Sequence, residues 1–236
     1  MGRLYKSVLG KASGKVGDIV FRIVKGKVYI ASHIGKNKIS DSPDCIENRS
    51  RFSALLNFAS AVNKIPDLKI IWNKFRKSTK SGYNKIISVN TKFMVGNQIS
   101  KQNIITPDGF GLNNLNAVFS RKNVIVSFSL AEDSFEHSGK KFNACLVVAL
   151  LDPVSTIDRA SLSFSMFVSE VVADSSVFEV SFSVKDKKPL IEKYKRAIMF
   201  FVLTNTKQNN TLYSESYSFE FNLYKFFGFS EILETE

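Results

Sequence analysis

From about residue 104 onward the sequence alternates apolar and polar side chains with a period of two, and this feature constrains the fold most. Large apolar residues occupy every second position, with mostly Ser or Glu between them. The segments that show it are NVIVSFSL (123–130), SLSFSMFVS (161–169), VFEVSFSV (177–184) and SYSFEFNL (216–223). Successive side chains of a strand point to opposite faces, so each segment predicts a strand with one core face and one wet face.

Two further segments, FNACLVVALL (142–151) and RAIMFFVLTN (196–205), are apolar on both faces, as is typical of central or covered strands. With LNAVFS (115–120) they bring the total to about seven strands in ~120 residues, which predicts an immunoglobulin-like or fibronectin-like antiparallel β-sandwich. The only tryptophan, Trp72, precedes this part of the chain. The prediction is therefore the sandwich architecture, without the Cys–Trp–Cys pattern of antibody domains.

The first hundred residues predict a different local structure. DIVFRIVKGKVYIASH (18–33) holds two β-forming runs around Lys25-Gly26, a hairpin signal. Ser42-Pro43 then predicts a helix start, and Pro66 ends that helix. The apolar stripe expected on it contains Phe52, Leu55, Leu56, Ala59 and Val62. A second helix, from Asp67, places Leu68, Ile71, Trp72 and Phe75 on one face, and a third begins near Ser81.

Charge also divides the chain. Residues 1–103 carry a net charge of +15 and residues 104–236 a net of −3, within a total of +12. We therefore predict an α+β protein of two domains. Residues 1–103 form a basic module of glycine-rich arm, β-hairpin and helical block, and residues 104–236 form the sandwich.

The concentration of positive charge is the main candidate for a binding site. Lysines surround the hairpin and recur through the helical block. The predicted partner-binding residues are Lys25, Lys27, Lys36, Lys38, Lys69, Arg76, Lys77, Lys80 and Lys85. Such a surface attracts phosphate backbones without base specificity. Two alternatives remain open: an acidic surface of a partner subunit or of the chain's own second half, and plain solvated helix faces.

Motifs of catalysis are not recognisable. The glycines of GKASGKVGD (10–18) are not spaced as in a phosphate-binding loop. The segment GFGLNN (109–114) lacks the third glycine of a dinucleotide-binding motif. The only histidines, His33 and His137, fall in different predicted domains, and Glu132/Asp133 lie in a turn-like segment. The two cysteines, Cys45 and Cys145, are expected to be reduced thiols. We therefore expect no enzyme activity, cofactor, metal or small-molecule substrate.

The N-terminal sequence MGRLYKSVLGKASGKVGD lacks the apolar segment of a secretory signal, and no run of ~20 apolar residues predicts a membrane span. We expect a protein of the cytoplasm or one incorporated in a particle.

Two segments, GRLYKSVLGKASGKVGDIVF (2–21) and NRSRFSALLNFAS (48–60), resemble an uncharacterised family of domains of unknown function frequent in Bacteroidetes genomes. The resemblance implies the order of glycine-rich start, hairpin, helices and sandwich, and it implies no activity. With no catalytic pattern, we expect a structural or assembly subunit of a multimeric particle, virion-like or from a mobile element, that forms homo- or hetero-oligomers. The alternative is a sequence-independent nucleic-acid-binding protein.

Overall fold

The computed structural model describes residues 2–3, 13–24, 26–32, 40–75, 81–120, 122–130, 141–155, 162–172, 177–206, 211–223 and 226. The chain divides into two compact units, Met1–Ile46 and Glu47–Glu236. Charge suggested a division after Asn103, whereas contacts divide the chain after Ile46 and keep most of the helical block with the sandwich. The reason is that the helices share an apolar core with the sandwich.

The first unit contains a four-stranded antiparallel sheet of order β1-β4-β3-β2. Its strands are β1 (Gly2–Arg3), β2 (Gly14–Val16), β3 (Ile19–Val24) and β4 (Lys27–Ser32). The hairpin predicted around Lys25-Gly26 is confirmed, because Val24 pairs with Lys27 across a two-residue turn. Gly26 has a φ of +75°, a conformation that glycine adopts without steric cost.

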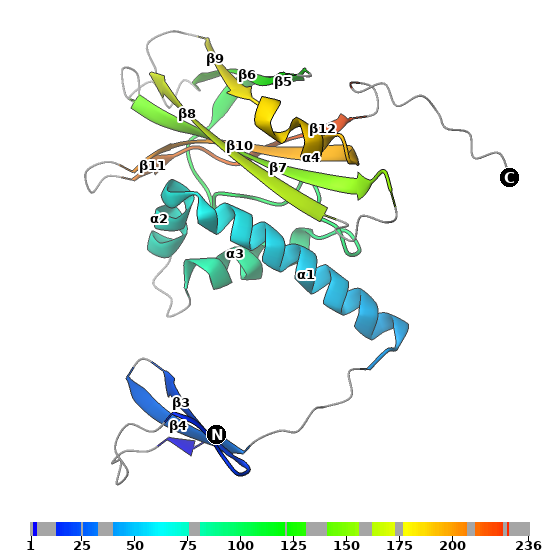
Figure 1. The fold of residues 1–236 in the computed structure, drawn as a ribbon. Coiled ribbons are helices and arrows are strands. Elements are labelled where there is room, and N and C mark those ends of the chain that lie inside the picture. Colours follow the sequence, from blue (N-terminus) through cyan, green and yellow to red (C-terminus); the bar gives the residue numbers. More distant parts are fainter. Residues whose placement is uncertain are drawn as a thin grey trace, which may run out of the picture. The chain divides into compact units, whose positions relative to one another are not determined.

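The second unit contains two antiparallel sheets that face one another (Figure 1). One has the order β5-β6-β9, and its strands are Leu112–Phe119, Asn123–Leu130 and Phe178–Ser183. The other has the order β11-β10-β7-β8, with β12 also paired to β10. Its strands are β7 (Lys141–Pro153), β8 (Leu162–Val172), β10 (Tyr194–Asn205), β11 (Leu212–Tyr213) and β12 (Tyr217–Asn222).

This strand order confirms the predicted immunoglobulin-like sandwich within an α+β fold. In immunoglobulin nomenclature the sheet β5-β6-β9 has the order A-B-E. The other sheet has the order C′-C-F-G, formed by β8, β7, β10 and β12. Tyr217 joins the two sheets, since its hydroxyl lies 2.6 Å from the backbone N of Leu112, which donates to it.

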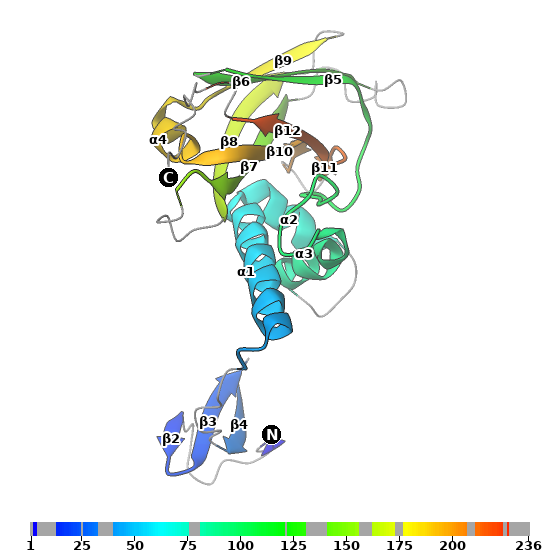
Figure 2. The same cartoon turned by 90° about the vertical axis from the view of Figure 1, so that its right-hand side faces the viewer.

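Strands β7 and β10 are buried on both faces, as their sequences predicted. Their side chains alternate between two cores. Leu146, Val148 and Phe201 lie in the core between the two sheets, whereas Val147, Ala149 and Phe200 lie in a core on the other side. The helices cover that other side (Figure 2). The second unit is thus three layers deep, with the five-stranded sheet in the middle.

The helical layer consists of α1 (Pro43–Lys64), α2 (Pro66–Lys74) and α3 (Gly82–Asn90). The predicted boundaries are confirmed at Pro43, at Pro66 and at Ser81, whose hydroxyl caps α3 by accepting from the backbone N of Asn84. The described residues of this unit also contain the short helical segments η1 (Thr91–Phe93), η3 (Lys185–Lys187) and α4 (Lys188–Ile191). Among the described residues no helix has both the length and the apolar character needed to cross a bilayer.

Two expectations about side-chain burial were wrong. Phe52 is 53% exposed, because no residue of α1 before Ala54 is buried and the helix is covered only beyond that point. On β8 the apolar residues Leu162, Phe164 and Met166 pack toward the helices. The alternate serines therefore face the sheet–sheet side rather than water, and Ser165 is only 2% exposed.

Candidate docking surfaces of the N-terminal sheet

The N-terminal sheet has two faces of opposite chemistry, and its hydrogen-bond register assigns residues to each. Directly paired residues of an antiparallel sheet share a face. The pairs Val16↔Ile19, Phe21↔Ile30 and Ile23↔Val28 therefore place six apolar side chains on one side. We call these residues the apolar face: Val16, Ile19, Phe21, Ile23, Val28 and Ile30.

Much of the apolar face is accessible. Val16 is 69% exposed, Ile19 46% and Ile23 44%, and Val28 alone among the described residues of this sheet is buried. A sheet is stable in water when a hydrophobic face is covered. The described part of the sheet therefore leaves these apolar side chains largely uncovered.

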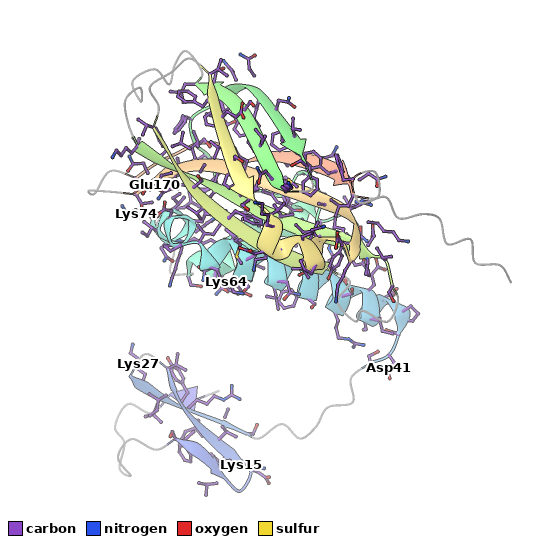
Figure 3. All side chains as sticks on the ribbon, turned by 45° about the horizontal axis from the view of Figure 1, so that its top comes forward. Lys15, Lys27, Asp41, Lys64, Lys74 and Glu170 are labelled. Atoms are coloured by element: carbon purple, nitrogen blue, oxygen red, sulfur yellow. The ribbon has the colours of Figure 1, made fainter. Side chains whose placement is uncertain are left out.

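The opposite side of the same sheet carries positive charge. The pairs Lys15↔Val20, Arg22↔Tyr29 and Val24↔Lys27 fix its residues. We call these residues the basic face: Lys15, Val20, Arg22, Val24, Lys27, Tyr29 and Ala31. Lys15, Arg22 and Lys27 are exposed and Tyr29 is half-buried. Figure 3 shows Lys27 and Lys15 toward opposite ends of the sheet.

The predicted basic residues that the structure describes fall in both units and differ in burial. Lys27 belongs to the basic face, and Lys69 is exposed on α2. Lys85 is buried, and its Nζ donates to the backbone oxygens of Phe75 (2.6 Å) and Asn73 (3.3 Å) at the C-terminal end of α2. Its ammonium stabilises the carbonyl end of a helix dipole, so it does not serve as a surface contact. The remaining predicted residues lie outside the described ranges: Lys25, Lys36, Lys38, Arg76, Lys77 and Lys80.

Asp67, in the first turn of α2, accepts three side-chain hydrogen bonds. Its Oδ2 accepts from Asn143 Nδ2 and Thr204 Oγ1, both at 2.8 Å, and its Oδ1 accepts from Thr206 Oγ1 at 2.8 Å. These bonds attach α2 to β7 and to the end of β10. Beside them burial raises the pKa of the Cys145 thiol to about 12, so this thiol stays protonated at neutral pH. The thiolate is the nucleophilic form of cysteine, and Cys145 is not in that form at neutral pH. We therefore interpret the cluster around Asp67 as structural, because its hydrogen bonds connect α2 to the sheet.

A small pocket beside the ends of β7 and β10 is lined by Lys141 and Glu170, among other residues. An open groove of about 320 Å³ lies between β8 and β9, and its only charged residues are Glu170 and Glu179. Within the described ranges no three His, Cys, Asp or Glu side chains are grouped so as to hold a metal ion. His33, His137 and the Glu132/Asp133 pair lie outside those ranges. The expectation of a non-catalytic protein stays a prediction.

Sequence reasoning missed the two-faced character of the N-terminal sheet, although the signal was present. Once the turn at Lys25-Gly26 is accepted, the register follows, and residues equidistant from the turn must face the same way. Ile23, Phe21 and Ile19 then align with Val28 and Ile30. Counting lysines by domain obscured this pattern, because charge was summed without reference to strand faces.

Comparisons with known proteins add little to this geometry. No family model matches the chain, and no curated protein matches it. A solved structure of β-glucosidase 3B from Thermotoga neapolitana, in complex with glucose, is similar at 14% sequence identity and a TM-score of 0.21. The similarity covers 49% of this chain and 17% of that one, and at this TM-score it indicates no shared activity. The resemblance to the Bacteroidetes family stays a prediction.

Proposed function

We propose that this protein is a non-catalytic assembly subunit whose copies associate through the apolar face of the N-terminal sheet. The observation that carries the proposal is the exposure of Val16, Ile19 and Ile23 on one side of a sheet that has a single buried residue among those described. Two such faces can pack as stacked sheets, about 10 Å apart, with their side chains interdigitated.

The apolar face is too small to hold two copies together strongly by itself. Strands of six residues on a sheet this wide give a face of about 20 Å by 15 Å, or about 600 Å² for two copies. Stable specific interfaces bury about 1,200 Å² or more, so one such contact is weak. Weak contacts hold an assembly together when each subunit is tethered by several of them.

Sedimentation velocity of the full chain tests the proposal, at about 1 to 200 µM, where a contact of this size associates. We expect the mean sedimentation coefficient to rise with concentration. Ile23→Asp places a carboxylate in the contact and should weaken association at least about tenfold. Val24→Asp is the matched control, because Val24 is the next residue of β3, is 51% exposed, and lies on the basic face.

Two results would count against the proposal. One is a wild-type chain that remains monomeric over the whole concentration range. The other is an equal loss of association in Ile23→Asp and Val24→Asp, which would mean that either aspartate simply disrupts the sheet.

A further inference from the structure

We propose that the basic face of the N-terminal sheet binds single-stranded nucleic acid, with Tyr29 as a stacking platform for a base. This surface is separate from the one that the assembly proposal uses, because the two faces lie on opposite sides of the same strands. The basic face remains accessible when the apolar face is covered.

The charges of this face are uncompensated within the described residues. Lys15, Arg22 and Lys27 are exposed, and none of them has an ion-pair partner among those residues. The one acidic residue in the described ranges 13–24 and 26–32 is Asp18, in the turn between β2 and β3. Cations without internal partners are free to release counterions from phosphates, which is the main source of affinity for nucleic acid.

The ring of Tyr29 gives this face a surface on which a base can stack, which lysine side chains do not provide. Tyr29 pairs directly with Arg22 across β3 and β4, so ring and guanidinium are neighbours on one surface. Lys27 lies two positions along the same strand, at about 7 Å. Single-strand-binding proteins combine these two elements, aromatic side chains under the bases and cations along the backbone.

The arrangement favours a single strand over a duplex or a lipid surface. Sequence-independent stacking needs unpaired bases, whereas duplex DNA is read by a helix or a ribbon inserted in a groove. A membrane would require a broad surface of bulky apolar side chains beside the basic ones. Besides Tyr29 the basic face carries Val20, Val24 and Ala31, and the six side chains of the apolar face lie on the other side of the sheet.

The helical block is a weaker candidate for the same ligand. Lys85 is committed to the end of α2, and the Nζ of Lys74 donates to Thr211 Oγ1 at 2.7 Å. Lys69 is exposed on α2, while the aromatic side chain of that helix, Trp72, is fully buried. A lysine without an accessible ring offers charge alone.

Fluorescence anisotropy with the full chain tests the inference, using a labelled oligothymidylate of about 20 nucleotides and the matching duplex. We expect tighter binding to the single strand and a logarithmic decline of affinity with salt. Tyr29→Leu keeps an apolar side chain but removes the ring, and should lower affinity about tenfold. Tyr29→Phe keeps the ring and should bind like the wild type. Arg22→Gln should lower the salt slope by about 0.7.

Lys69→Gln is the control in the second unit, and it should leave oligonucleotide affinity unchanged. Ile23→Ser, on the apolar face, separates this inference from the assembly proposal, because it should weaken self-association while the oligonucleotide still binds. Loss of binding in Tyr29→Phe as well as Tyr29→Leu would point to a disrupted sheet, and the stacking role would then be rejected.

Other outcomes would overturn the inference. Failure to bind the oligonucleotide at low salt removes it outright. Preference for the duplex, or equal affinity in Tyr29→Leu and the wild type, would show that the surface binds polyanions in general and would overturn the stacking role of Tyr29. Binding to vesicles of mixed phosphatidylserine and phosphatidylcholine that depends on Arg22, without oligonucleotide binding, would assign the face to a membrane.

Discussion

The five-stranded sheet of the second unit and the four-stranded sheet of the first are both antiparallel and both rich in apolar side chains. They differ in what covers them. In the five-stranded sheet Phe200 packs toward the helices and Phe201 toward the second sheet, and both are fully buried. In the N-terminal sheet Ile23 and Val24 point to opposite faces and are both about half exposed.

The difference teaches that one sheet is complete within its own unit, whereas the other is not. Burial of both faces supplies the apolar free energy that a folded layer needs. Among the described residues of the N-terminal sheet only Val28 is buried, so these residues contribute little of that free energy. The assembly that we propose would supply the missing cover.

The largest effects are expected from removing a ring on either side of the five-stranded sheet. Phe200→Ala and Phe201→Ala should each lower the free energy of unfolding by about 3–5 kcal/mol, because each leaves a cavity in a dry core. Phe21→Ala, in the N-terminal sheet, should cost the second unit less than about 0.5 kcal/mol.

Guanidinium unfolding followed by the fluorescence of Trp72 measures these values, since Trp72 is the only tryptophan and is fully buried in the helical layer. A cost under about 1 kcal/mol for Phe200→Ala would contradict the assignment of the helices as the second cover.

A glycine in each unit gives the next contrast. At Gly109, with φ +148°, an added Cβ would lie 2.3 Å from the carbonyl carbon of Ser214. Gly109→Ala should therefore cost about 3 kcal/mol through backbone strain and forced displacement of β11. At Gly26 nothing lies within 4 Å of the added Cβ, so Gly26→Ala should cost about 1 kcal/mol, from backbone strain alone.

Thermal unfolding of the two glycine variants by calorimetry makes the comparison. The expected result is a clear drop in the Tm of the second unit for Gly109→Ala only. Equal Tm values for Gly109→Ala and the wild type would show that the close approach of residues 109 and 214 does not stabilise the sandwich.

The joint between α2 and the sheet should give an intermediate effect. Asp67→Ala leaves the donors of Asn143, Thr204 and Thr206 without their acceptor, and we expect a loss of about 2 kcal/mol in the free energy of unfolding. Asp186→Ala, an exposed aspartate in η3, is the matched control and should change stability by less than about 0.5 kcal/mol. Urea denaturation of both variants measures the free energy of unfolding. Similar losses in Asp67→Ala and Asp186→Ala would contradict a structural role for Asp67.

The smallest effect concerns alkaline pH. Burial raises the pKa of the Cys145 thiol from 9.0 to about 12, so the folded state holds the proton longer than the unfolded state does. Stability from this group is complete below pH 9 and falls as pH rises toward 12. By pH 10 the loss is on the order of 1 kcal/mol.

Cys145→Ala should remove that part of the pH dependence, measured as the free energy of unfolding at pH 7 and pH 10. Burial also raises the pKa values of Tyr213 and Tyr217, so both variants keep an alkaline decline from the tyrosines. An identical decline in the wild type and in Cys145→Ala would mean that water reaches the helix-covered face of the sheet.

Local pattern was sufficient to predict much of this fold. Alternation at Phe178, Val180 and Phe182 correctly placed β9 with its apolar face in the core. Pro43 correctly marked the start of α1, because proline lacks the donor that a first helical turn leaves unused, and Pro66 correctly marked the end of α1. The apolar runs of β7 and β10 predicted a cover on both sides.

The expectations that failed concerned residues whose environment comes from distant parts of the chain. The burial of Phe52 depends on where the covered part of α1 begins, and periodicity along the helix carries no such information. The role of Lys85 depends on the end of α2 lying within reach of its ammonium. Charge counts likewise grouped the helices with the hairpin, whereas shared apolar burial groups them with the sandwich.

The amino-acid order by itself determined which segments become strands and helices, because hydrogen-bond periodicity and proline and glycine geometry act over a few neighbouring residues. Tertiary structure alone decided which face of each element is covered, and by what. Coverage depends on contacts between residues as far apart in the chain as Phe58 and Phe200. Such contacts bury both faces of the central strands of the five-stranded sheet, whereas Val28 is the only buried residue among those described in the N-terminal sheet.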